Sequence, residues 1–280
     1  MSYDGPILDD HCHLDPEAGR GMDAVDDFDR AGGTHLMVCN RPSWDHGVEV
    51  DEAADFRPVL EATEATVERA AERLDGTAWP VLGVHPALVS RLLERGFDPD
   101  EAAELMQTGL DVAAEFAAAG PAVALKTGRP HYDVDDAVWD ASNRVLRHGL
   151  ELAAESGVAV QLHTESTDDL SAVGEWAADA GLAPERVVKH YAGGPTAGVT
   201  PSVIARPDPL REAAEAGDPF LMETDYLDDA ERPGAVLGPK TVPRRVTSLA
   251  DEGFDEALRT AHVEAPASVY GVDTTGTLAR

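Results

Sequence analysis

The hydrophobic positions of the chain fall into eight short apolar runs, separated by longer segments of mixed polarity. Each run is almost continuously apolar until its last residues, which is typical of parallel strands buried on both faces. The predicted strands are Pro6–Leu14, Thr34–Asn40, Trp79–Pro86, Ala122–Gly128, Val158–Thr164, Arg186–Ala192, Thr200–Arg206 and Phe220–Tyr226.

Segments rich in Ala, Glu, Arg and Leu lie between these runs, with their apolar residues at helical spacing. The clearest predicted helices are Asp51–Leu74, Pro99–Ala118, Ala137–Glu155 and Asp168–Ala180. Strands that alternate with helices predict an α/β protein, and eight of them predict a TIM (β/α)8 barrel, which has about 250 residues. We therefore expect a single domain over residues 1–280, with a doubly wound open sheet as the main alternative.

Acidic residues dominate the composition, with 53 Asp and Glu against 22 Lys and Arg, and a formal charge of −31. The charge is spread along the chain, and only 5% of residues are aromatic. We interpret this as a halophilic globular protein whose carboxylates cover the surface. At molar salt the Debye length is about 3 Å, so the charge says little about partners.

The first residues lack the basic and apolar regions of a signal peptide. The sequence has no apolar stretch of about eighteen residues, so we expect no membrane span. The two cysteines, Cys12 and Cys39, fit a reduced compartment better than a disulfide framework. These features predict a cytoplasmic protein without a membrane partner.

Histidines are concentrated at the carboxyl ends of the predicted strands, where TIM barrels carry their active sites. Six of the ten histidines lie there: His11, His13, His85, His131, His163 and His190. Chance placement would scatter them over the longer helical segments as well. This concentration predicts a functional site at the barrel mouth.

A metal site is the chemistry that this pattern favours. His11 and His13 are two residues apart, so both side chains lie on one strand face and Cys12 on the other, among the helices. His163 and His190 end the fifth and sixth strands, and four imidazoles from three strands form a typical metal-binding set. Asp225, at the end of the eighth strand, can bind a metal and accept a proton from water.

This ordered set of residues resembles the TatD-related metal-dependent hydrolases of the amidohydrolase superfamily. The segments "GVHP" and "GRPHY" are similar to TatD segments too, so the resemblance covers nearly the whole chain. It implies a TIM barrel, one or two divalent metals and hydrolysis of phosphodiester bonds, as in a deoxyribonuclease. It also implies ligand roles: His11, His13 and Asp225 for the more buried metal, His163 and His190 for the second, and His85 facing the substrate.

One residue departs from that family. Where its members place a glutamate that bridges the metals, this chain has Lys126, one of only three lysines. Phosphotriesterase-like members of the superfamily have a lysine there, and CO₂ converts it to a carbamate that bridges two metals. We expect the same carboxylation of Lys126, since burial beside cations favours the neutral amine that it requires. A free ammonium with a mononuclear site, or an exposed lysine, are the alternatives.

Four further residues are candidates with less specific roles. Arg41, Arg129 and His131 follow strand ends and could bind an anionic substrate group, although a structural or surface role is equally open. Glu223 precedes Asp225 by two residues and could support a ligand from the second shell, or be a buried, hydrogen-bonded carboxylate.

Two enzyme classes therefore remain open, a phosphodiesterase and a lactonase or amidase, with non-catalytic metal binding as a third reading. The substrate is a small molecule or a phosphodiester, and no basic surface dedicated to nucleic acid is evident. Zinc suits the ligand set best, and Mn, Fe, Ni and Mg also fit. The sequence does not give the oligomeric state.

Overall fold

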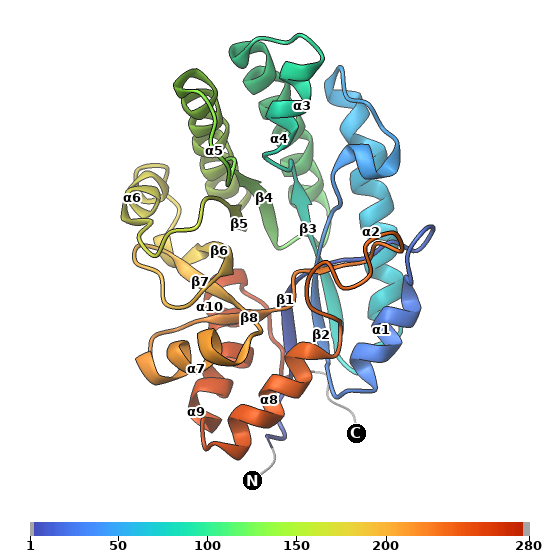
Figure 1. Cartoon of the computed structure of the whole chain (residues 1–280), viewed down its shortest axis with the longest axis vertical. Coiled ribbons are helices and arrows are strands. Elements are labelled where there is room, and N and C mark those ends of the chain that lie inside the picture. The colour runs from blue at the N-terminus through green and yellow to red at the C-terminus, as the bar shows by residue number, and fades with distance from the viewer. Residues whose placement is uncertain (1–2, 277–280) are drawn as a thin grey trace.

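The centre of the molecule is a curled sheet of parallel strands in the order β8-β7-β6-β5-β4-β3-β2-β1-β9 (Figure 1). The computed structural model describes residues 3–276. All eight predicted runs form strands, and this arrangement confirms the predicted α/β barrel. The strands are β1 (Leu8–His13), β2 (His35–Cys39), β3 (Thr77–Gly83), β4 (Ala124–Gly128), β5 (Ala159–His163), β6 (Val187–Ala192), β7 (Thr200–Ile204), β8 (Leu221–Glu223) and β9 (Tyr226–Leu227).

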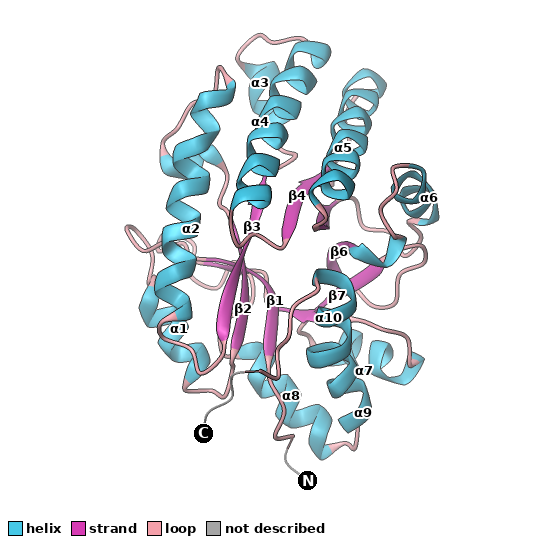
Figure 2. Cartoon of the chain, turned by 180° about the vertical axis from the view of Figure 1, so that it is seen from behind, coloured by secondary structure: helices cyan, strands magenta, loops and turns pink. Residues whose placement is uncertain are grey.

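Helices cover the outer face of this sheet, as the views from both sides show (Figures 1 and 2). The four predicted helices are present, the first of them divided into a 3₁₀ turn and α2. The helices are α1 (Met22–Asp29), α2 (Arg57–Ala71), α3 (Leu88–Glu94), α4 (Pro99–Ala119), α5 (Asp136–Ser156), α6 (Ser171–Asp179), α7 (Pro207–Ala216), α8 (Thr241–Asp251), α9 (Asp255–Arg259) and α10 (Ala265–Tyr270). Short 3₁₀ turns lie at Ser43–His46, Ala53–Phe56 and Pro184–Arg186, and a π-helical turn at Thr260–Glu264. Over residues 3–276, no helix combines the length and apolar character needed to span a membrane.

Small and aliphatic side chains fill the barrel interior towards the amino ends of the strands. Leu8, Met37 and Val81 lie there, together with Ala124 and Ala159, and all are buried. Tyr270 of α10 belongs to the same cluster and is hydrogen-bonded to Gln161 of β5. Because this end is packed with apolar groups, the polar side chains of the strands collect at the opposite, carboxyl end.

The barrel seam lies between the last strands and β1. β9 pairs with the carboxyl end of β1, whereas β8 lies beside the amino-terminal half of that strand. There the carboxylate of Asp9 accepts hydrogen bonds from the Thr224 backbone nitrogen at 2.9 Å and from its hydroxyl at 2.6 Å. A side chain thus takes over the role that ladder hydrogen bonds have elsewhere in the sheet.

The connection between β6 and β7 differs from the predicted alternation of strands and helices. Residues 193–199, all described, contain no helix. The segment holds glycines 193, 194 and 198 and a proline at 195, residue types that disfavour a helix. A cleft of about 1150 Å³ lies along this outer side of the barrel, lined in part by Lys189, Glu212 and Phe220.

Candidate metal centre

Three imidazoles from two distant parts of the chain meet inside the barrel mouth. His11 and His13 come from β1 and His190 from β6. The Nε2 atoms of His11 and His13 are 3.2 Å apart, and the rings of His11 and His190 stack with centroids 4.0 Å apart. All three are buried, and burial is the main reason that the pKa of each lies well below its ordinary value. The rings are therefore neutral at neutral pH.

Each of these rings uses its Nδ1 atom to contact an oxygen. His11 Nδ1 lies 2.6 Å from Gln161 Oε1, His13 Nδ1 lies 3.0 Å from the Cys39 carbonyl, and His190 Nδ1 lies 2.8 Å from Glu223 Oε1. An acceptor at Nδ1 places the proton of a neutral imidazole there and leaves a lone pair on Nε2. Histidines that bind metals are oriented in this way by oxygen atoms that accept a hydrogen bond from the ring and do not bind the metal themselves.

Asp225 reaches the same point from the seam. It follows β8 with a φ of 47°, a left-handed conformation that is uncommon for a residue other than glycine. Its Oδ1 atom is 3.9 Å from Nε2 of both His11 and His13. Burial raises the pKa of Asp225 to about 7, although the nearby Lys126 lowers it. This backbone bend brings a carboxylate to the lone pairs of the two β1 histidines.

Lys126 also points into the site. The side chain belongs to β4, is only 2% exposed, and places Nζ 3.4 Å from His11 Nε2. The possibility of an exposed lysine is therefore wrong. Burial lowers the pKa of Lys126, whereas the anionic groups Asp225 and Glu223 raise it. The hydrogen-bond acceptor that the Lys126 amine contacts is the Nε2 lone pair of His11. Binding of a metal, or a modification of the amine, would remove this competition for the lone pair.

The remaining predicted histidines form a second group beside the first. His163 of β5 stacks near His190, with ring centroids 5.4 Å apart, and its Nε2 lies 2.8 Å from Nδ1 of the exposed His131. His85 lies 4.8 Å from His163 between ring centroids, and its Nδ1 accepts a hydrogen bond from the Ala87 backbone. Burial lowers the pKa of His85 to about 3, so its neutral ring carries the proton on Nε2. The structure thus assembles all six strand-end histidines at one mouth.

The two arginines at the rim are bound by groups of the protein itself. Arg41 pairs with Asp15 and with Asp45. Arg129 pairs with Glu165 and donates a hydrogen bond to Asn143 Oδ1 at 3.0 Å. Both side chains are largely buried. These contacts give each arginine a structural role, and binding of a substrate by either one stays a prediction.

Glu223 is fully buried and contacts His190 rather than solvent. This is the geometry of a residue that supports a ligand, and Glu223 also belongs to a possible metal group with His11 and His190. Cys39 and Gln161 were not predicted as parts of the site. Cys39 ends β2 and Gln161 lies in the middle of β5, and a polar or sulfur-containing side chain within a largely apolar strand is the signal that could have identified them.

The ligand set fits a divalent metal. One atom each of His11, His13 and Cys39 lie within 4.8 Å of one another, as do those of His11, His190 and Glu223. Imidazole nitrogens with free lone pairs, a carboxylate and a thiol are the donors that divalent transition metals prefer. Cys12, by contrast, packs between β1 and the helices with Phe28 and Val67, as predicted.

A parallel α/β barrel with imidazoles gathered at its carboxyl mouth defines a metal-dependent hydrolase. The chain belongs to the TatD related DNase family, whose model matches residues 8–270. It is 33% identical over 283 residues to an uncharacterised protein of Methanocaldococcus jannaschii, with 96% of each chain covered.

Solved structures support the fold. The TatD homolog YJJV from Escherichia coli K12 matches with a TM-score of 0.57 and 21% identity, over 95% of this chain and 98% of the other. The lactonase Lmo2620 from Listeria monocytogenes matches with a TM-score of 0.56 and 14% identity, over 96% and 95%. An organophosphorus hydrolase from Deinococcus radiodurans matches with a TM-score of 0.52 and 15% identity, over 96% and 93%.

Proposed function

We propose that this protein hydrolyses phosphodiester bonds with divalent metals held at the barrel mouth. The proposed metal ligands are His11, His13, Lys126, His163, His190 and Asp225. The observation that carries this proposal is the common orientation of His11, His13 and His190, whose Nδ1 atoms all face oxygen acceptors. Such an arrangement leaves three lone pairs directed inward, which is the orientation that metal-binding histidines have.

Divalent metals bound here would polarise the scissile bond and lower the pKa of the attacking water. Asp225 would accept the proton of that water and pass it to the leaving group, a role suited to a carboxyl group whose pKa is raised to about 7 by burial. His85 would donate a hydrogen bond from Nε2 to the substrate, since its Nδ1 is already an acceptor.

Lys126 would take part as a carbamate. Its ammonium first loses one proton to solvent, and the neutral amine then attacks the carbon of CO₂. An N–C bond forms as one C=O π bond opens, the nitrogen releases a second proton to solvent, and the side chain becomes an anionic oxygen donor. The burial of Lys126 and its lowered pKa favour the neutral amine that this step needs. A carbamate reaches further than the amine and supplies two oxygens, which suits a ligand that bridges two metals.

Lys126 also favours a second candidate function. A lysine in place of the bridging glutamate is the feature of phosphotriesterase-like hydrolases, and it supports a lactonase or amidase acting on C–O or C–N bonds. The two functions differ in substrate and share the metal ligands.

Hydrolysis assays in molar salt test these functions directly. Protein reconstituted with zinc, or with manganese, is given bis(nitrophenyl) phosphate, DNA and a lactone. We expect cleavage of the phosphodiesters above that of the lactone. Cleavage of the lactone alone would select the second function, and metal-loaded protein that cleaves none of the three would contradict both.

Metal content tests the role of Lys126. The variant Lys126→Ala should hold one metal where the native chain holds two, and a short carboxylic acid should restore the second. Lys189→Ala is the matched control, because Lys189 is buried on β6, two strands from β4, but donates to the Thr167 carbonyl at 2.6 Å. Two metals in Lys126→Ala without added acid would rule out a bridging carbamate.

A further inference from the structure

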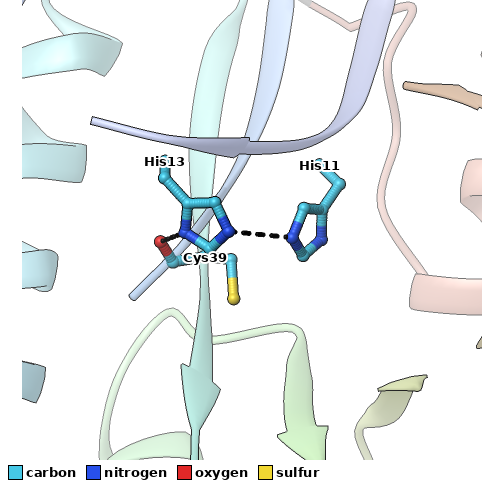
Figure 3. Close-up of side chains that lie close together, drawn as sticks. All are labelled: His11, His13 and Cys39. Atoms are coloured by element: carbon cyan, nitrogen blue, oxygen red, sulfur yellow. Dashed lines mark hydrogen bonds between the residues drawn. The ribbon is translucent and has the colours of Figure 1, made fainter. Parts of the chain in front are cut away.

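The thiol of Cys39 lies beside two imidazoles of the candidate metal centre. Cys39 is the last residue of β2 and is 1% exposed, in the interior cluster with Leu8 and Met37. Its sulfur and a ring nitrogen of both His11 and His13 lie within 4.8 Å of one another. Figure 3 shows the three side chains converging from β1 and β2.

The backbone of Cys39 is already part of this site. Its carbonyl oxygen contacts His13 Nδ1 at 3.0 Å and so turns the Nε2 lone pair of that ring inward. One residue therefore orients a neighbouring imidazole through its main chain and presents sulfur to the same space. The second cysteine has the opposite placement, since the Cys12 thiol faces the helix-covered side of β1 and lies 3.6 Å from the Met37 carbonyl.

The spacing of the His11 and His13 nitrogens fits a metal site. With metal–nitrogen bonds of about 2.05 Å, two imidazole nitrogens of a tetrahedral site are roughly 3.3 Å apart, and a thiolate at about 2.3 Å lies slightly further from each. The Nε2 atoms of His11 and His13 are 3.2 Å apart, as such a site requires. Asp225 Oδ1, at 3.9 Å from both nitrogens, lies near the same point.

We propose that Cys39 binds the more buried metal as a thiolate, together with His11, His13 and Asp225. This inference rests on the proposed function, because it adds a ligand to the same centre. Binding forms one metal–sulfur bond and releases the thiol proton to solvent.

A sulfur ligand changes the metals that the centre accepts. Thiolate is a soft donor that favours zinc and cobalt, whereas magnesium and manganese prefer oxygen ligands. The inner position should therefore retain zinc in the presence of excess magnesium. The second position, which His163 and His190 would supply, has no sulfur among its proposed ligands and should exchange its metal more readily.

Cobalt provides a readout that is independent of activity. Native protein loaded with one equivalent of Co²⁺ should show a sulfur-to-cobalt charge-transfer band in the near ultraviolet. Cys39→Ser should lose that band while keeping the visible bands of bound cobalt. Cys12→Ser is the matched control and should keep both, because its sulfur lies on the other side of the strand.

X-ray absorption of the native, zinc-loaded protein needs no variant and should find one sulfur at about 2.3 Å from zinc. Bound cobalt without a charge-transfer band, or zinc without sulfur, would overturn the role of Cys39 and leave the proposed function intact. A native protein that binds neither metal would overturn both.

Discussion

His190 Nδ1 and Tyr191 N both contact the same carboxylate oxygen, Oε1 of Glu223, at 2.8 and 2.9 Å. The carboxylate thereby fixes the ring of His190 and the main chain that follows it, where Tyr191 has a φ of 57°. A fully buried carboxylate with these partners supports β6 at the point where the strand enters the candidate metal centre.

Replacing Glu223 by glutamine should weaken metal binding. The amide oxygen can still accept a hydrogen bond from His190, but the negative charge that raises the basicity of the ring is gone. Loss of such an outer contact typically costs about 10- to 100-fold in metal affinity. Competition with a chelator measures this change, with Glu165→Gln as control, since Glu165 pairs with Arg129 at the rim. Equal affinities in the two variants would contradict this role of Glu223.

The barrel seam should depend on the hydroxyl of Thr224. It donates to Asp9 at 2.6 Å and accepts from the Tyr226 backbone at 3.0 Å. Thr224→Val removes both contacts and leaves the Asp9 carboxylate and the Tyr226 backbone nitrogen without the hydroxyl as a partner. We therefore expect a loss of about 2–3 kcal/mol in the free energy of unfolding. Urea denaturation of the apoprotein at fixed high salt measures it.

Thr66→Val is the control for that substitution. Its hydroxyl donates to the Ala62 carbonyl, one turn back in α2, and the lost bond is local to the helix. We expect a loss of no more than about 1 kcal/mol there. Equal losses in the two variants would mean that the seam contacts contribute no more than a helical threonine does.

Gly83 should not tolerate a side chain. A Cβ atom at this position would lie 1.9 Å from the carbonyl oxygen of Lys126, so β3 and β4 would have to move apart. Gly83→Ala should therefore both destabilise the protein and reduce its metal content by displacing Lys126. Gly193→Ala, at a position with open space, is the control. Native metal content in Gly83→Ala would contradict the proposed dependence of the centre on this strand spacing.

His262 should make the protein sensitive to acid. It is fully buried, accepts a hydrogen bond from the Leu8 backbone at 3.1 Å, and burial lowers its pKa from 6.5 to about 3. Below pH 6.5 the unfolded state binds a proton at His262 that the folded state excludes. The free energy of unfolding is therefore unaffected by this residue above pH 6.5 and decreases as the pH falls towards 3.

The variant His262→Asn keeps an acceptor for Leu8 and has no such titration. Between pH 7 and pH 4 the native protein should lose about 3 kcal/mol more stability than this variant. Unfolding curves of the metal-free proteins at the two pH values measure the difference. Parallel losses in both proteins would show that His262 does not carry the effect.

The periodicity of the sequence was sufficient to predict the strands and the barrel mouth. A parallel strand buried on both faces leaves a continuous apolar run, and its carboxyl end is the place for polar groups, so the histidines could be located without coordinates. The orientation of each ring could not, because it depends on Gln161, Glu223 and the Cys39 carbonyl, which are distant in the chain. Contacts of that kind leave no periodic signal.

Two features of the fold had equally little signal. The seam closes through Asp9, which lies inside an apolar run and looks like any acidic residue next to "DHCHLD". The bend at Asp225 is a single left-handed residue of a type that local patterns do not reveal. The Asp9 contact and the Asp225 bend both occur where the chain passes from β8, beside the first half of β1, to β9, which pairs with the end of β1. This passage depends on how the sheet closes, and a local sequence pattern does not show it.

The helix-free connection after β6 has a consequence for engineering. Residues 193–199 run beside an open cleft, and none of the proposed metal ligands lines it. An amphipathic segment grafted into this connection has room to pack against the exposed wall. The chain therefore offers a site where length can be added, and a reporter or a binding module attached, in a cleft that the proposed metal ligands do not line.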